Sequence, residues 1–132
     1  MILPSSALVW LSFLVSLGLG FLTAFYVDYI LSLIGFWTTD LDGLFWAKDS
    51  IILILGGTYL PLWIYPPLLR RVLAFLPFQG ISYTPVAIFV GQIGLDQVAR
   101  AFAVQIIWLV ILAAGSRRLY ASAIRKLAVQ GG

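Results

Sequence analysis

Apolar residues run along most of this chain in long uncharged stretches, separated by short polar clusters. The first stretch covers residues 1–39 and is interrupted by a single charge, Asp28. No turn dipeptide breaks it, and Trp10 and Trp37 lie 27 positions apart, which corresponds to roughly 40 Å of helix. Tryptophan collects at the two membrane interfaces, which are about 40–45 Å apart. The pattern therefore predicts one membrane-spanning helix near residues 6–38.

Two further apolar stretches predict membrane spans. Residues 44–60 are flanked by Trp46 and Trp63 and correspond to roughly 25 Å of helix, which is barely enough to cross a bilayer. Residues 97–116 form the third predicted span, which continues into a basic tail over residues 117–132.

The segment between the second and third predicted spans is apolar but is broken by proline and glycine. Residues 61–95 are too interrupted for a straight crossing and too apolar for a free loop. Irregular backbone at membrane depth is tolerated where protein covers it, so we expect a re-entrant segment of short helices that dips into one membrane face and returns. One helix is predicted at residues 66–76, because Pro66 and Pro67 precede its apolar residues and Pro77 follows them.

The composition supports a membrane protein and excludes several classes of function. Hydrophobic residues make up 62% of the chain and charged residues 10%, against about 45–50% and about 25% in soluble proteins. The chain has no histidine and no cysteine, which excludes imidazole or thiolate metal sites and histidine-based catalysis. Its net charge of +3 is too small for a nucleic-acid-binding protein, and it has no P-loop. We expect an all-α integral membrane protein without catalytic residues, metal or cofactor.

The distribution of positive charge predicts the orientation in the membrane. The tail holds four basic residues, Arg117, Arg118, Arg125 and Lys126. The positive-inside rule therefore places the C-terminus in the cytoplasm of a multi-pass plasma-membrane protein. With three spans, the polar loop of residues 39–49 is also cytoplasmic, whereas residues 1–6 and 61–95 face outside together with Arg70, Arg71 and Arg100. Residues 117–126 of the tail predict an amphipathic helix on the lipid surface, with docking to a cytoplasmic partner as the alternative.

Small and polar residues recur every four positions along the first predicted span. The row consists of Ser12, Ser16, Gly20, Ala24, Asp28 and Ser32. Rows of small residues allow helices to approach closely in lipid. We interpret Ser12, Ser16, Gly20 and Ala24 as a helix-packing face within one subunit or a dimer, with a wall of a substrate pathway as the alternative. A break of this predicted helix at Gly18 or Gly20 is a further alternative.

Two polar residues lie inside predicted spans and are candidates for a substrate pathway. Asp28 precedes Trp37 by nine positions, about 13 Å inside the interface, where an unpaired charge costs about 2.5–3.5 kcal/mol. It is either a protonated or hydrogen-bonded structural group, or a group that contacts substrate or couples to a proton, and we expect no base beside it in the membrane. Gln105 shares a helix face with Trp108, where helix–helix contact is expected.

The block of residues 57–78, GTYLPLWIYPPLLRRVLAFLPF, resembles the outer re-entrant segment of ATP-binding cassette (ABC) exporter permeases of the type-2 class. The similarity rests on Pro61, the pair Pro66-Pro67, a short amphipathic helix and the final Pro77-Phe78. Two further motifs are similar to one branch of that class, the uncharacterised six-span permeases. These motifs are Phe36-Trp37-Thr38 and the ending Val129-Gln130-Gly131-Gly132.

The resemblance implies the fold, the partners and the role of the proline block. Such permeases carry three more spans upstream, so the chain is expected to be the C-terminal half of a longer permease. They pair with a second permease subunit, identical or different, and with a separate ABC ATPase subunit, and they contact membrane lipids. The outer gate would then be shaped by Pro61, Pro66, Pro67, Pro77 and Phe78.

The expected function is therefore a permease subunit, or a fragment of one, of an ABC exporter. It would form part of the substrate pathway and outer gate, with ATP hydrolysis in another polypeptide. The alternative is a small, non-transporting membrane scaffold that associates through the small-residue face of the first span. A membrane-embedded enzyme that uses the aspartates of residues 40–49 is a weaker alternative.

Overall fold

The computed structural model describes residues 6–131, and every regular element in this part of the chain is a helix. The elements are α1 (Ala7–Ile34), α2 (Leu41–Leu55), the 3-10 turn η1 (Leu62–Ile64), α3 (Pro67–Phe75), α4 (Pro77–Ile81), α5 (Tyr83–Phe89) and α6 (Leu95–Gly131). The expectation of an all-helical protein is thus confirmed over the described residues. The expectation that residues 1–5 face outside lies beyond them.

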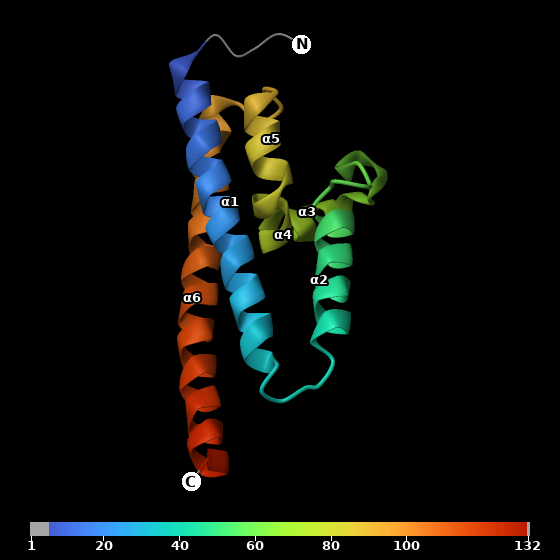
Figure 1. The fold of residues 1–132 in the computed structure, drawn as a ribbon. Helices are drawn as coiled ribbons and strands as arrows, with labels where there is room; N and C mark the ends of the chain where they lie inside the picture. The colour runs from blue at the N-terminus through green and yellow to red at the C-terminus, as the bar shows by residue number, and fades with distance from the viewer. Residues whose placement is uncertain (1–5, 132) are drawn as a thin grey trace.

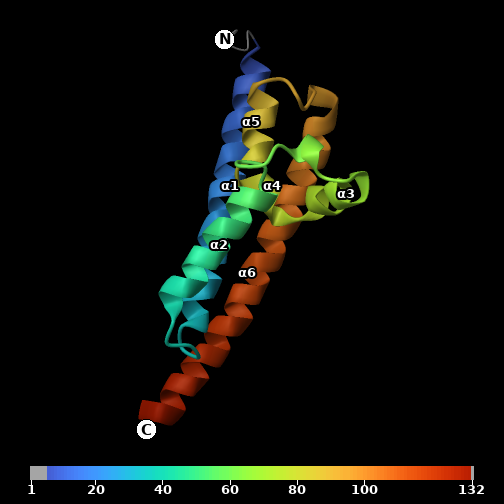
Figure 2. The same cartoon turned by 90° about the vertical axis from the view of Figure 1, so that its right-hand side faces the viewer.

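Two long helices, α1 and α6, lie side by side and run in the same direction (Figures 1 and 2). Helix α2 runs in the opposite direction from the C-terminal end of α1 and stops about halfway along it. From there α4 and α5 continue toward the N-terminal end of α1, where Phe89 packs against Trp10 with ring centroids 5.2 Å apart. Two successive segments, α2 and α4–α5, therefore cover the length of α1.

Helix α1 ends earlier than predicted, so the predicted span of residues 6–38 is wrong at its end. The Gly35 N–H donates to the carbonyls of Leu31 and Ser32, and the chain then turns toward α2. A Cβ at Gly35 would lie 2.9 Å from the Leu41 side chain, so this glycine permits the close turn between the two helices. Trp37 consequently lies beyond the end of α1, so the spacing between Trp10 and Trp37 does not correspond to the length of a single helix. The helix continues without a break through its internal glycines.

Helix α2 is shifted toward the N-terminus relative to the predicted span of residues 44–60. It begins earlier because the Asp40 carboxylate accepts a hydrogen bond from the Gly43 N–H at 2.9 Å and so caps the helix. It ends at Leu55 because Gly57 adopts a φ of +81°, a conformation that glycine adopts at little cost. Its 15 residues correspond to about 22 Å, which is less than the hydrocarbon thickness of a bilayer.

The segment of residues 61–95 folds into short helices, and one of them is the helix predicted at residues 66–76. It is observed as α3, with Pro67 in its first turn, and Pro77 begins α4 in the same way. Proline suits these positions because the first helical N–H groups have no partner in their own helix. The end of α2 is held to the start of α5 by Ser82, whose hydroxyl donates to the Gly56 carbonyl at 3.3 Å.

Helix α6 continues through the predicted third span and the basic tail without a break. Its 37 residues correspond to about 55 Å. Lys126 donates to the Phe36 carbonyl at 2.8 Å and lies 5.4 Å from the centre of the Trp37 ring. Residues 117–126 are thus helical, as predicted, and their placement on the lipid surface stays a prediction. The tail continues α6 in line and packs against the loop between α1 and α2.

A buried polar cluster of Ser16, Gly80 and Gln105, here called the Gln105 cluster, joins α1, α4 and α6. Gln105 is 3% exposed. Its Nε2 donates to the Ser16 carbonyl at 3.1 Å and to the Gly80 carbonyl at 2.8 Å, and its Oε1 accepts from the Ser16 hydroxyl at 3.1 Å. One side chain thus uses both amide hydrogens and its oxygen to fix three helices.

The apolar surface of the bundle is largely uncovered. Helices α1 and α6 are long and apolar enough to cross a membrane, yet only 22% and 11% of their most apolar windows are buried. Phe21 of α1 is 72% exposed and Val110 of α6 is 62% exposed. Such surfaces are typical of helices that face lipid or another subunit, because a soluble protein would bury them.

Gly20 provides a test of the packing between α1 and α4. A Cβ at Gly20 would lie 2.6 Å from the Gly80 carbonyl oxygen and 3.0 Å from that of Ile81, whereas Gly18 has open space around it. We expect Gly20→Ala to destabilise the fold by about 1–3 kcal/mol, because backbone atoms must move apart. Gly18→Ala is the matched control and should be neutral or stabilising. Thermal unfolding in detergent measures both, and equal melting temperatures would contradict the close approach.

Candidate functional site

The intramembrane candidate Asp28 has a basic partner, contrary to the sequence-based expectation. Its Oδ1 lies 2.6 Å from Lys48 Nζ, which also lies 2.7 Å from Asp49 Oδ1. The side chain of Lys48 is 15% exposed. The expectation failed because residues 39–49 were interpreted as a polar loop. Most of that segment is helical, and α2 folds back along α1 and carries Lys48 toward Asp28.

The ion pair changes the interpretation of Asp28. A carboxylate within an apolar helix must be paired, hydrated or neutralised, and Lys48 supplies a counter-charge. The pair also joins the C-terminal half of α1 to the middle of α2, a helix that has no buried residue. These contacts support a structural, hydrogen-bonded role for Asp28.

The residues of the predicted packing face lie against the chain's own helices. Ser12, Ser16 and Gly20 are buried, and their neighbours belong to α4, α5 and α6. Ala24 is only half-buried, and Thr23 is buried in its place. The shift occurs because a helix has 3.6 residues per turn, so a row spaced by four drifts around it.

Gln105 and Trp108, which were expected to share a face, contact different elements. Gln105 forms the Gln105 cluster, whereas the Trp108 indole N–H donates to the Phe75 carbonyl at the end of α3. The face of α6 that carries both residues thus holds α1, α4 and the end of α3 together. This arrangement leaves Gln105 no free polar group for a substrate.

The five residues expected to shape an outer gate lie between the end of α2 and the start of α4. Pro61, Pro66 and Pro67 are exposed, Pro77 is buried and Phe78 is half-buried. Of the five, Pro67 lines a cavity that Arg70 and Arg71 of α3 also line. These five residues therefore lie where α2, which runs along the C-terminal half of α1, is connected to α4 and α5, which run along its N-terminal half.

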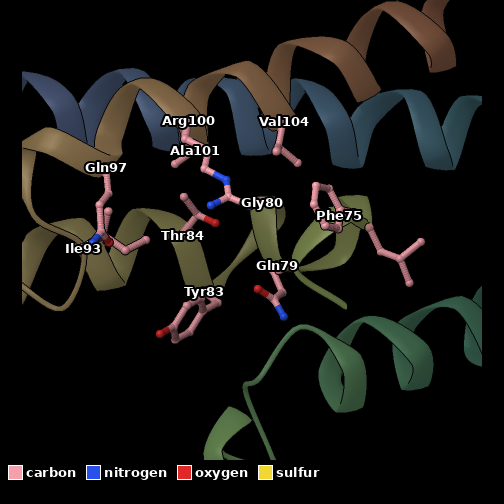
Figure 3. Close-up of a pocket in the computed structure, with 12 residues that line it drawn as sticks. Phe75, Gln79, Gly80, Tyr83, Thr84, Ile93, Gln97, Arg100, Ala101 and Val104 are labelled. Carbon is pink, nitrogen blue, oxygen red and sulfur yellow. The ribbon is translucent and has the colours of Figure 1, made fainter. Parts of the chain in front are cut away.

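A cavity of about 260 Å³ lies between α3, α4, α5 and α6, and the sequence alone did not indicate it. Figure 3 shows Arg100 extending from α6 toward Thr84, with the Phe75 ring nearby. The Arg100 guanidinium carbon is 5.9 Å from the centre of that ring. Gln79, Tyr83 and Gln97 add polar groups to the lining, and the rest of it is largely apolar.

Within residues 6–131, no group of three histidine, cysteine, aspartate or glutamate side chains is arranged to hold a metal ion. The polar features of the described part are the ion pairs of Lys48 with Asp28 and Asp49, the Gln105 cluster and a cavity lined in part by Arg100.

Exchanging the charges of Asp28 and Lys48 tests the structural role of the pair. We expect Asp28→Asn and Lys48→Gln each to lower stability by about 1 kcal/mol, because each removes the same interaction. The double exchange of Asp28→Lys with Lys48→Asp should be less destabilising than the sum of its two component single exchanges, which a double-mutant cycle of melting temperatures in detergent measures. Asp49→Asn is the comparison and should cost less, because the Asp49 side chain, although it also pairs with Lys48, is 63% exposed. Strictly additive effects would contradict the coupling.

Comparison with known families identifies the chain. The model of a family described as ABC-2 family transporter protein matches residues 3–131. Searches among curated proteins and among solved structures gave no significant match. The resemblance of the chain to type-2 ABC permeases is thereby confirmed, and the family is a membrane transport component. With a family match over nearly its whole length and with helices whose apolar surfaces are uncovered, the chain belongs to the ABC-2 family of transporter proteins.

Proposed function

We propose that this chain is a permease subunit, or part of one, of an ABC exporter in the plasma membrane. It forms part of the substrate pathway and the outer gate, and a separate ATPase subunit supplies the energy. The observation that carries the proposal is the family match over residues 3–131. The alternative of a non-transporting scaffold is less favoured, because the small-residue face it would use packs against α4, α5 and α6 of the same chain.

The uncovered apolar faces support the proposed partners. Phe21 and Phe25 of α1 and Ile107 of α6 are all more than half exposed, although helices of this composition avoid water. A second permease subunit and membrane lipids would cover these faces. The same faces would meet the upstream spans if the chain is the C-terminal half of a longer permease.

The proposed topology has three crossings and a cytoplasmic C-terminus. Helices α1 and α6 are long enough for two crossings, and α2 is the shorter second one. The segment of residues 61–95 is the re-entrant part, which covers the outer half of α1 that α2 does not reach. The basic residues at the end of α6 favour the cytoplasmic side.

The proposed gate is the segment from η1 through α3 to the start of α4. Only Leu73 is buried in α3, so this helix is less firmly packed than the bundle of α1, α4, α5 and α6. The prolines hold the helix starts in fixed conformations, which allows the segment to move as short rigid pieces. Closure of the ATPase subunits would rock the spans and alternate access to the pathway.

Recruitment of an ATPase tests the proposal directly. The tagged chain, purified from its native membrane in mild detergent, should retain an ABC ATPase that mass spectrometry identifies. The complex should hydrolyse ATP, which the chain without its partner should not do. An unrelated multi-pass protein with the same tag is the control. A stable preparation that never recruits an ATPase would count against the permease function and would favour the alternative of a non-transporting scaffold.

Cysteine labelling tests the gate and the topology without knowledge of the substrate. The chain has no cysteine, so Leu68→Cys, at a 76% exposed position of α3, reports alone. In the complex with its ATPase, its labelling rate by an impermeant maleimide from outside should change severalfold when vanadate traps the nucleotide. Ala121→Cys, exposed near the end of α6, is the control and should react only from inside, at an unchanged rate.

Pro66 and Pro67 should be required for the vanadate-dependent change in the labelling rate at position 68. Replacing Pro66 and Pro67 by alanine should leave membrane insertion intact, because both residues are exposed, but should reduce the vanadate-dependent change at position 68. A position 68 that labels from the same side as position 121, or at the same rate with and without vanadate, would refute the gate.

A further inference from the structure

A cavity of about 300 Å³ lies along one face of α2, the helix at the edge of the bundle (Figure 1). Five of its six lining residues belong to the helix and one follows it. They are Trp46, Asp49, Ser50, Leu53, Ile54 and Tyr59. The five helical positions are separated from the first by three, four, seven and eight residues, which is the spacing of a single helix face. All the lining side chains therefore border one space.

The chain beyond α2 turns back and brings Tyr59 to one end of this cavity. The turn occurs at Gly57, whose φ is +81°, and the Tyr59 N–H donates to the Leu53 carbonyl at 3.0 Å. Trp46 precedes Leu53 by seven positions, which corresponds to about 10 Å along the helix. The two aromatic residues thus belong to opposite ends of the cavity, and they are 79% and 70% exposed.

Asp49 lies between the two aromatic residues and is the one charged residue in the lining. Lys48 Nζ lies 2.7 Å from its Oδ1, but the same Nζ lies 2.6 Å from Oδ1 of Asp28. One ammonium group is shared by two carboxylates, so negative charge is in excess. The side chain of Asp49 is 63% exposed, whereas that of Lys48 is 15% exposed and does not line the cavity.

The rest of the lining favours a cation that carries apolar groups. The Ser50 hydroxyl donates to the Trp46 carbonyl at 2.9 Å, so its proton is used within α2, and Leu53 and Ile54 are apolar. The faces of aromatic rings attract cations, and tryptophan does so most strongly. A metal ion such as Ca²⁺ requires several oxygen ligands, whereas this lining supplies one carboxylate.

We propose that this cavity binds an organic cation with apolar substituents. Its positive centre lies near Asp49, and its apolar groups contact Trp46 and Tyr59. The attraction to an exposed carboxylate is weak in water, but it is stronger beside a membrane span, because lipid screens charge much less than water does. The inference concerns binding by the chain alone. It goes beyond the proposed transport function and does not depend on recruitment of an ATPase.

Two probes of the same shape and opposite charge test the site. Tetraphenylphosphonium is a permanent organic cation, and tetraphenylborate is its anionic counterpart. The full chain in phosphatidylcholine nanodiscs is dialysed to equilibrium against each radiolabelled probe, and empty nanodiscs give the amount that partitions into lipid. After this amount is subtracted, we expect saturable binding of the phosphonium and no saturable binding of the borate.

Substitutions in the lining should weaken binding of the phosphonium. We expect Asp49→Asn to weaken it about fivefold, because the variant removes the only charge in the lining. Trp46→Leu and Tyr59→Leu should each weaken it about threefold, because each removes an aromatic face. Trp46→Phe keeps a ring and should lose less than Trp46→Leu.

Matched controls lie on the same part of the chain but outside the cavity. Asp42→Asn, in the first turn of α2, changes the net charge as Asp49→Asn does. Trp63→Leu removes a 73% exposed tryptophan. Neither residue lines the cavity, so each control should change the affinity for the phosphonium less than about twofold.

Two outcomes would overturn the proposal. One is that the phosphonium shows no more saturable binding than the borate. The other is that Asp42→Asn and Trp63→Leu weaken binding as much as the substitutions in the lining do. Melting temperatures identify any variant that fails to fold. The exposed positions of Trp46 and Tyr59 keep the test informative if Asp49→Asn is such a variant.

Discussion

The hydrogen bonds of Gln105 are the interaction on which this architecture depends. Between helices that face lipid, burial of apolar surface gives little driving force, so close packing and polar contacts decide how helices associate. Gln105 satisfies its amide on Ser16 and Gly80, and Gly20 lets the α4 backbone approach α1. The Gln105 amide fixes how α1, α4 and α6 are aligned along their axes, and Gly20 determines how closely the α4 backbone approaches α1. The hydrogen bonds of Gln105 form only at this close approach.

This cluster divides the molecule into a firmly held part and a loosely held part. Gln105 joins α1, α4 and α6, whereas α2 is held at its middle by the Asp28–Lys48 pair and just beyond its C-terminal end by Ser82. Helix α3 lies between the two parts and buries only Leu73. A transporter needs such a division, because alternating access requires one group of helices to move relative to another. The arginine-lined cavities lie where the two parts meet.

Local signals predicted the elements well where the chemistry is local. Pro67 and Pro77 start helices because they lose no hydrogen bond in a first turn, so α3 was predicted to within one residue at each end. The Asp40 cap and the end of α1 at Gly35 were not recognised, because apolar runs and tryptophan spacing measure membrane thickness and not helix ends. The third predicted span was expected to continue into the basic tail, and α6 does so as one helix from Leu95 to Gly131.

The sequence by itself determined that the chain is helical, apolar and built for a membrane, because composition and the spacing of prolines, glycines and charges act through local backbone preference and transfer to lipid. The tertiary structure alone decided which polar groups meet. Asp28 and Lys48 lie 20 positions apart, and Ser16 and Gln105 lie 89 apart. Their proximity depends on how far α2 extends and where α4 crosses α1, and no local pattern encodes either quantity.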